Sequence, residues 1–306
     1  MNANKSRGGH STTVVFRLTT ILARGMVAAH HALPSGNDEP SATTTTAATT
    51  IRPHAVDMRL SDSALREACR AGLEGTLTPM LALHHHGCAA ELAELAARAR
   101  AHHRLDSSSL PPQCACDFDG PLEPPAREVR TKLTALCERL LEVLVGEAAP
   151  LDGRICMRTY PRAAPADGDA DADADANANA DGSAQQRLGA HCDNTLLTLL
   201  WADGPGLQVL HPGRADGWTP ERVMRYGLPT MSDADEIQTL GEEQWATVEL
   251  PWADGPLLLT LGCAWMSSEL TRDHPAQCAV LHRVVLPPGY PRDRHSIPFL
   301  VDLAGK

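Results

Sequence analysis

The triplet His191-Cys192-Asp193 constrains this chain more than any other part of its sequence. Side chains of a strand alternate between its two faces, so His191 and Asp193 project to the same side if the triplet lies on or just before a strand. An imidazole and a carboxylate placed in this way supply two of the three ligands of the facial triad that holds non-haem Fe(II). The apolar runs TLLTLLW (195–201) and GLQVL (206–210) that follow predict two strands with a turn between them.

A second group of polar residues near the C-terminus makes the triplet more specific. An isolated His-x-Asp is a weak metal motif, because short polar triplets are common. His282, however, lies within the short apolar run AVLHRVVLP (279–287), which predicts a strand. Arg294 and Ser296 are two residues apart in DRHSIPFLVD (293–302), so on a strand they share a face. The chain therefore has a His-x-Asp pair, a distant His and an Arg-x-Ser pair, in that order.

In these stretches the chain resembles the isopenicillin N synthase-like 2-oxoglutarate/Fe(II)-dependent dioxygenases. The residues that carry the resemblance are LGAHCDNTLLTLL, GLQVL, the LHRVV around His282 and RHSIPF at the end. The resemblance covers residues 155–302 well. It implies a mainly β fold with flanking helices, in which a double-stranded β-helix (jelly-roll) core follows an N-terminal helical region.

The resemblance also implies a role for each of these polar residues. The implied Fe(II) ligands are His191, Asp193 and His282. Arg294 and Ser296 would hold the distal carboxylate of 2-oxoglutarate, to which the hydroxyl of Tyr160, in the Tyr160-Pro161 pair, would add a donor. A planar guanidinium suits that carboxylate because it can donate two parallel hydrogen bonds.

The activity implied by the resemblance is the oxidation of a small organic substrate, by hydroxylation or desaturation. Two neutral imidazoles and one carboxylate leave open positions on Fe(II) for 2-oxoglutarate and O₂. Succinate and CO₂ are the implied by-products, and ascorbate would support the reaction.

Two other functions are compatible with the same residues. The three ligands and a water could bind Zn²⁺ for hydrolysis, although the Arg-x-Ser pair has no use in that chemistry. A non-catalytic metal- or small-molecule-binding β-barrel descended from such an enzyme would account for departures from the family pattern. One departure is Arg158, which stands where the family has Asn in its Asn-x-Tyr-Pro element. Another is the N-terminal half, which lacks the family's aromatic residues after its first helix and has only a short stretch, 111–125, between its second and third helices. Cys263, which follows Gly262 where the family commonly has Asp, is expected to have only a small structural cost.

The sequence before the core divides into two regions. We expect residues 1–50 to be a disordered or targeting segment and residues 51–150 to be a helical N-terminal region. The resemblance implies that residues 151–306 form the double-stranded β-helix domain that binds Fe(II) and 2-oxoglutarate. Met1–Asn37 contains basic residues and no acid, which fits either a mitochondrial or plastid transit peptide or a flexible tail on a cytoplasmic protein. Helices are expected over 63–73, 89–103 and about 126–145.

Several segments within the core are expected to be irregular or extended. The alternating Ala/Asp/Asn tract at 166–186 predicts a disordered acidic insertion, because these residue types are depleted in strands. Residues 211–244 form a second insertion that is rich in Gly, Pro and acids. Further strands are predicted at 155–161, 245–251 and 257–266.

The composition excludes some classes of function and partner. The net charge of −11 and the lack of a clustered basic patch argue against a nucleic-acid partner, and no run is apolar enough to cross a membrane. The nine cysteines have no disulfide-framework spacing, and Cys114-x-Cys116 is too tight for the usual zinc pair. Consecutive side chains diverge, so the run His84–His86 is interpreted as structural. We expect a monomer that acts on a small molecule.

Overall fold

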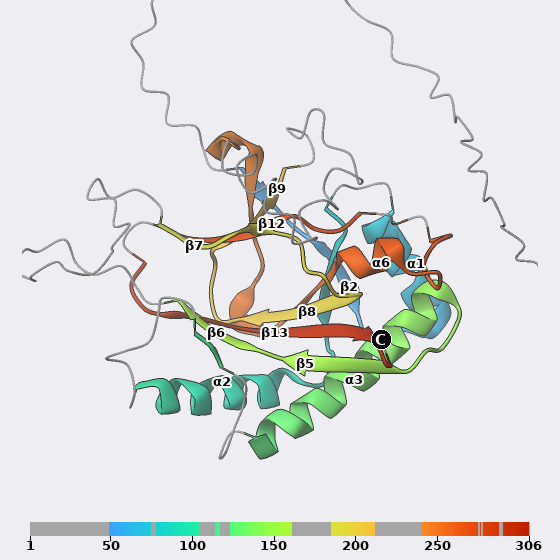
Figure 1. Cartoon of the computed structure of the whole chain (residues 1–306), viewed down its shortest axis with the longest axis horizontal. Coiled ribbons are helices and arrows are strands. Elements are labelled where there is room, and N and C mark those ends of the chain that lie inside the picture. The colour runs from blue at the N-terminus through green and yellow to red at the C-terminus, as the bar shows by residue number, and fades with distance from the viewer. Residues whose placement is uncertain are drawn as a thin grey trace, which may run out of the picture. The chain divides into compact units, whose positions relative to one another are not determined.

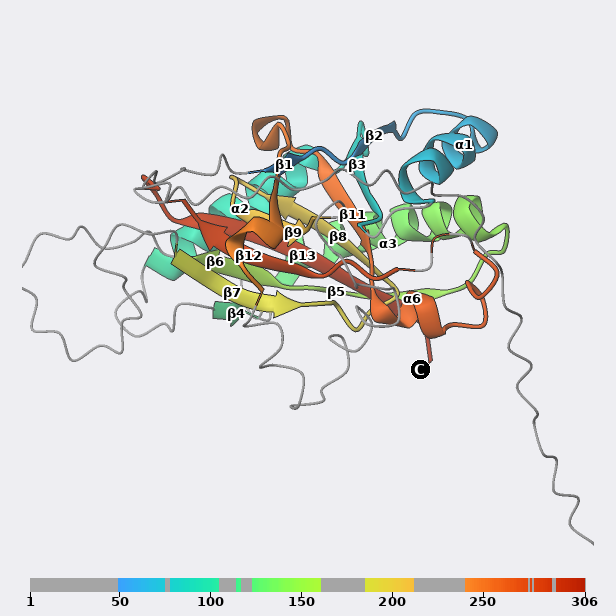
Figure 2. The same ribbon diagram turned by 90° about the horizontal axis from the view of Figure 1, so that it is seen from above.

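Two β-sheets lie face to face, and two long helices cover the outer side of one of them (Figure 1). This is a computed structural model. It describes residues 49–305 except 75–77, 105–113, 117–122, 161–184, 212–239, 275, 277 and 288–289. Seen from above, β12 and β9 of one sheet overlie β13 and β8 of the other (Figure 2). This arrangement leaves an interior between the sheets that both can line with side chains.

The smaller sheet has five strands within the described residues. Their order is β1 (Thr50–Ile51), β10 (Trp245–Val248), β9 (Leu207–Leu210), β12 (His282–Leu286) and β7 (Gln185–His191). All pairs are antiparallel except β1 with β10. The register between β12 and β7 shifts twice, which is typical of a β-bulge.

The larger sheet has eight strands within the same described residues. Their order is β2 (His54–Asp57), β3 (Met80–His84), β11 (Leu257–Leu261), β8 (Leu197–Ala202), β13 (Arg294–Leu303), β6 (Met157–Tyr160) and β4 (Cys114–Cys116), and β5 (Leu151–Ile155) pairs with β13 beside β6. Only β2 and β3 are parallel.

The central strands of the larger sheet are apolar because both of their faces are covered. In β8 every residue except Leu200 is buried, and the first six residues of β13 are all buried. A strand that is buried on both faces reads as a nearly continuous apolar run rather than as an alternation. This explains why TLLTLLW and IPFLV carry so few polar residues. The polar residues they do contain, such as Thr198 and Ser296, are therefore candidates for the interior site.

Helices α1 (Asp62–Leu73), α2 (Ala89–Arg104) and α3 (Glu123–Val145) confirm the three helices predicted from the sequence. The predicted stripe of α3 is buried at Val129, Leu133, Leu140 and Leu144. Together with apolar residues of α1 and α2, these side chains form one core against the larger sheet. Figure 1 shows α2 and α3 beneath that sheet, on the side away from the smaller one.

Three predictions for regular structure were wrong in detail. The region before residue 150 also contains β3, a buried five-residue strand that pairs with β11. The strand predicted at 257–266 ends at Leu261, and Cys263–Ser267 forms the short helix α6. The strand predicted at 155–161 is divided at Cys156 into β5 and β6.

Parts of the other predictions lie outside the described residues. Of the predicted disordered segment 1–50, residues 1–48 lie outside, but Thr50 pairs with Thr247 in the smaller sheet. Of the acidic insertion 166–186, residues 166–184 lie outside, whereas Gln185 and Gln186 belong to β7. Of the second insertion 211–244, residues 212–239 lie outside. Among the helices of the described residues, none combines the length and apolar character needed to cross a membrane.

Candidate metal centre

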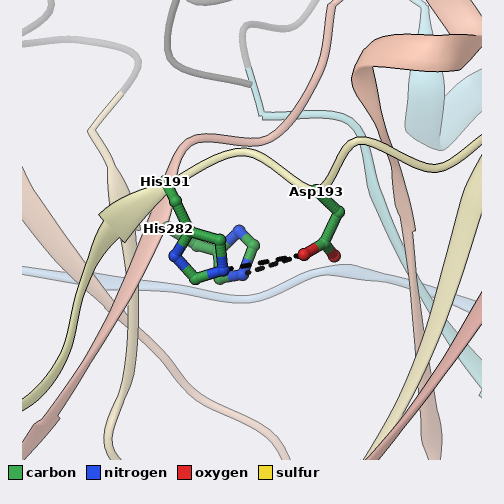
Figure 3. Close-up of side chains that lie close together, drawn as sticks. All are labelled: His191, Asp193 and His282. Atoms are coloured by element: carbon green, nitrogen blue, oxygen red, sulfur yellow. Dashed lines mark ion pairs between the residues drawn. The ribbon is translucent and has the colours of Figure 1, made fainter. Parts of the chain in front are cut away.

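The side chains of His191, Asp193 and His282 point toward one another at one end of the smaller sheet (Figure 3). His191 is the last residue of β7, and His282, the first residue of β12, pairs with it directly. Asp193 Oδ1 lies 3.6 Å from His191 Nε2 and 4.0 Å from His282 Nε2. Two donors bound to one ion at about 2.0–2.2 Å lie at most about 4.4 Å apart. Both separations are within this limit.

Backbone carbonyls fix which nitrogen of each imidazole faces the centre. His191 Nδ1 lies 2.8 Å from the carbonyl oxygen of Gly189, and His282 Nδ1 lies 3.0 Å from that of Val280. A carbonyl can only accept a hydrogen bond, so each Nδ1 carries the proton and donates it. Each Nε2 of the neutral rings then has a free lone pair that faces Asp193. This is the orientation that metal-binding histidines adopt.

Asp193 is held in its ionised form by its neighbours. Burial raises the pKa of this carboxyl, but His282, His191 and Thr198 outweigh that effect and hold the pKa well below its usual value. The Thr198 hydroxyl donates a hydrogen bond of 2.6 Å to Asp193 Oδ2. This bond leaves Oδ1, the oxygen nearest to both imidazoles, available to an ion.

His282 is held in its neutral form. Burial, followed by the neighbouring His191, lowers the pKa of His282 to about 4. The positive charge of Arg158 also lowers the pKa of His282, by less than the other causes do. A neutral imidazole and an ionised carboxylate are the forms that bind metal. The donor set of two nitrogens and one oxygen therefore fits a divalent metal ion such as Fe(II).

The loop that carries Asp193 rests on the start of α6. The amide of Cys263 donates to the carbonyl oxygen of Asp193 at 2.8 Å, and the amide of Ala264 donates to that of Thr195 at 3.2 Å. A Cβ atom at Gly262 would lie 2.0 Å from the carbonyl oxygen of Thr195. Only glycine allows this close approach, so Gly262 has a structural reason to be present.

A pocket of about 540 Å³, including its open mouth, lies between the two sheets next to the three side chains. The larger sheet contributes alternate residues of β13 and β6 to its lining, and the smaller sheet contributes residues of β9 and β12. The residues with polar side chains in the lining are Arg158, Tyr160, His191, Asp193, Thr198, Thr260, His282, Arg294 and Ser296. The predicted metal ligands and the predicted 2-oxoglutarate-binding residues thus line a single pocket.

Arg294 has a fully buried side chain that is only partly satisfied. Its relative exposure is 0%, and Nε donates to the carbonyl oxygens of Pro205 at 2.7 Å and Gly204 at 3.2 Å. The two terminal nitrogens are buried and have no hydrogen-bond partner among the residues that the structure describes. The guanidinium carbon lies 5.2 Å from the centre of the Tyr160 ring. A buried cation with unpaired donors is costly unless an anion completes it.

The pairing of β13 with β6 brings Tyr160 and Ser296 beside Arg294. Arg294 pairs with Tyr160 across the two strands, and Ser296 pairs with Arg158. Because strand residues two apart share a face, all four side chains face the pocket. The intervening residues, Thr159 and His295, bond each other at 3.1 Å.

Three polar residues of the pocket, Arg158, Thr198 and Thr260, were not assigned a role from the sequence. Thr198 is a single polar residue inside a buried apolar strand, a signal that could have identified it. Arg158 was noted only as a departure from the family pattern, because sequence alone does not show that it lines the pocket. The run His84–His86 agrees with its structural interpretation at His86, whose Nε2 donates to the carbonyl oxygen of Gly255. Among the described residues, the triad of Figure 3 is the only His/Cys/Asp/Glu group that could hold a metal ion.

Comparison with known proteins shows which fold this is. No family model matches the chain, and no curated protein matches it significantly. A Shewanella oneidensis protein provisionally assigned as an oxygenase has a TM-score of 0.52 at 17% identity, over 83% of this chain and 91% of that one. A full-length Neurospora crassa protein, solved with α-ketoglutarate (2-oxoglutarate), has a TM-score of 0.50 at 14% identity, over 82% and 85%.

The chain therefore shares its fold with these two proteins, and the two facing sheets form a double-stranded β-helix, or jelly roll. This fold confirms the one implied by the sequence resemblance.

Proposed function

We propose that this protein is an Fe(II)- and 2-oxoglutarate-dependent dioxygenase that oxidises a small organic substrate. The observation that carries the proposal is the buried guanidinium of Arg294, whose two unpaired nitrogens share a pocket with the His191, Asp193 and His282 side chains. A metal-binding triad alone would fit many functions. A second cationic group in the same pocket suits a metal-bound ligand that carries a carboxylate at its far end.

Six residues of the pocket have a role in this proposal. His191, Asp193 and His282 hold Fe(II), and their carbonyl and hydroxyl partners keep the three donors oriented. Arg294 binds the distal carboxylate of 2-oxoglutarate through its free nitrogens. Ser296 and Tyr160 add hydroxyl donors on either side of it. When Fe(II) and 2-oxoglutarate are bound, they supply oxidative decarboxylation by O₂, which releases succinate and CO₂ and delivers one oxygen atom to oxidise the substrate.

The two other functions considered from the sequence are less well supported. A zinc hydrolase has no use for a buried Arg-Ser-Tyr group in the same pocket. A non-catalytic barrel has no need to keep Arg294 buried and unpaired, since an apolar residue there would be less costly. A surface ion pair between Arg294 and Asp293 is also excluded, because Arg294 is fully buried and its Nε bonds to backbone carbonyls.

Calorimetric titration of the Mn(II)-loaded full chain with 2-oxoglutarate tests the proposal. The wild type should bind 2-oxoglutarate, and Arg294→Lys should bind it at least about tenfold more weakly, because an ammonium cannot replace the two-pronged guanidinium. Mn(II) affinity should not change in this variant. Arg98→Lys, an exposed position on α2, is the matched control and should behave as wild type.

Succinate formation from 2-oxoglutarate with Fe(II), ascorbate and O₂ is the second measurement. His282→Ala should abolish both metal binding and succinate formation, because the site loses one of its three ligands. Absence of 2-oxoglutarate binding in the wild type, or equal affinity in wild type and Arg294→Lys, would leave only a metal-binding barrel.

A further inference from the structure

Arg158 is a second cation in the pocket that neither the metal ion nor the cosubstrate needs. It lies on β6, two residues before Tyr160 and opposite Ser296 on β13, and it lines the pocket. Its Nε is buried and has no hydrogen-bond partner in the described part of the chain. Among the described residues, it forms no ion pair within 4.0 Å. Arg158 thus resembles Arg294 in being a pocket guanidinium with unused donors.

Among the described residues, the charges that line the pocket leave Arg158 without a counter-ion. A divalent metal ion exceeds the charge of Asp193 by one, and Arg294 adds a second positive charge. The dianion 2-oxoglutarate balances these two charges. Asp193 is the only acid among the described lining residues, so the positive charge of Arg158 remains. An unpaired charge in a partly desolvated pocket favours binding of an anion.

The rest of the lining limits what that anion can be. Apart from the residues already assigned, the pocket is lined mainly by the aliphatic side chains of leucines, valines and one proline. Such a surface gains free energy from burying an apolar body and offers few polar partners to a sugar or a nucleotide. The pocket therefore suits a small molecule that is apolar except for one negatively charged group.

We propose that the primary substrate is a small apolar carboxylic acid, whose carboxylate is bound by Arg158. This inference rests on the proposed function, because it assumes that 2-oxoglutarate occupies the Arg294 end of the pocket. A guanidinium presents two parallel N–H donors to a carboxylate, which gives orientation as well as affinity. Binding at Arg158 would hold the acid group at a fixed point on the β6 side of the pocket and direct the apolar body toward the metal centre.

Matched acids and amides test this proposal. The full chain is loaded with Mn(II), which prevents turnover, and titrated first with 2-oxoglutarate alone. It is then titrated, at saturating 2-oxoglutarate, with phenylacetate, phenylacetamide, 4-methylpentanoate and 4-methylpentanamide. Each pair has the same apolar body and differs in charge. The wild type should bind at least one acid about tenfold or more tightly than its amide, since a charge-assisted pair is lost in the amide.

Two substitutions locate the preference. Arg158→Gln should reduce the acid-over-amide preference to less than about twofold, while amide affinity and 2-oxoglutarate affinity stay within about twofold of wild type. Arg158→Lys keeps the positive charge but loses the two parallel N–H donors of the guanidinium, so it should retain part of the preference for the acid. Arg98→Gln on the exposed face of α2 should change nothing.

Three results would overturn the proposal. In the first, the wild type binds no acid, or binds none more tightly than its amide. In the second, Arg158→Gln keeps the preference for the acid. In the third, Arg158→Gln loses affinity for 2-oxoglutarate. The last result would assign Arg158 to the cosubstrate. Failure of the first titration, with 2-oxoglutarate alone, would refute the proposed function and this inference with it.

Discussion

Replacing Arg294 with methionine should show separately how the buried guanidinium affects the stability of the ligand-free protein and how it contributes to binding 2-oxoglutarate. In the ligand-free protein, two of its three nitrogens are buried without partners, and only Nε is bonded. Each buried, unsatisfied polar group costs about 1–3 kcal/mol, and more when it is charged. Methionine has a similar length and no polar donor.

The expected change in stability follows from these terms. Arg294→Met removes two unsatisfied donors and a buried charge, but it leaves the carbonyl oxygens of Gly204 and Pro205 without their donor, at about 1–3 kcal/mol. The ligand-free variant should therefore be as stable as wild type or up to about 3 kcal/mol more stable. Truncation of a large buried side chain usually lowers stability by about 2–5 kcal/mol. The sign of the change in unfolding free energy therefore shows whether the unpaired guanidinium destabilises the ligand-free protein.

Thermal unfolding of the Mn(II)-loaded protein, with and without 2-oxoglutarate, is the assay. At a 2-oxoglutarate concentration about 100-fold above Kd, the wild type should gain about 2.7 kcal/mol. For a domain of this size that corresponds to a rise in Tm of roughly 5–10 °C. Arg294→Met should show no rise, and Arg98→Met should show the full one. A ligand-free Arg294→Met protein that is less stable than wild type by about 1 kcal/mol or more, or one that keeps the rise in Tm, would refute this reasoning.

Three further outcomes are expected. Thr198→Val removes the hydroxyl bonded to Asp193 and should weaken Mn(II) binding about 10- to 100-fold with little change in fold, as measured by titration and circular dichroism. Burial lowers the pKa of His282 to about 4 in the folded protein. Between about pH 6.5 and pH 4, the His282 imidazole is therefore protonated in the unfolded chain but not in the folded one. The metal-free protein should then lose up to about 3 kcal/mol between pH 6.5 and 4, and urea unfolding should show a flatter profile for His282→Asn. Deletion within 166–184 should leave Tm nearly unchanged, because loop-closure entropy depends weakly on length; a large loss would show that the acidic tract contributes contacts.

The parts of the fold that the sequence predicted correctly are those governed by local periodicity. The stripe of α3 repeats every three or four residues, and it is buried at every predicted position except Leu136, which is partly buried. The apolar runs of β8, β9 and β12 also form strands. The errors occurred where local signals were ambiguous. Cys263–Ser267 continues an apolar run, yet the chain turns into a helix there because its first amides bond the carbonyls of the Asp193 loop.

For the site, the sequence determined which side chains share a face, and the tertiary structure decided which faces meet. Alternation along a strand is a local property, so it placed Arg294 with Ser296 and His191 with Asp193 before any fold was known. The direct pairing of His282 with His191, and of Arg294 with Tyr160, joins residues far apart in the chain. Such pairings depend on strand register, which is fixed by burial across the whole sheet rather than by neighbouring residues. The same register places Arg158 opposite Ser296, so that Arg158, which the sequence showed only as a departure from the family pattern, lines the pocket.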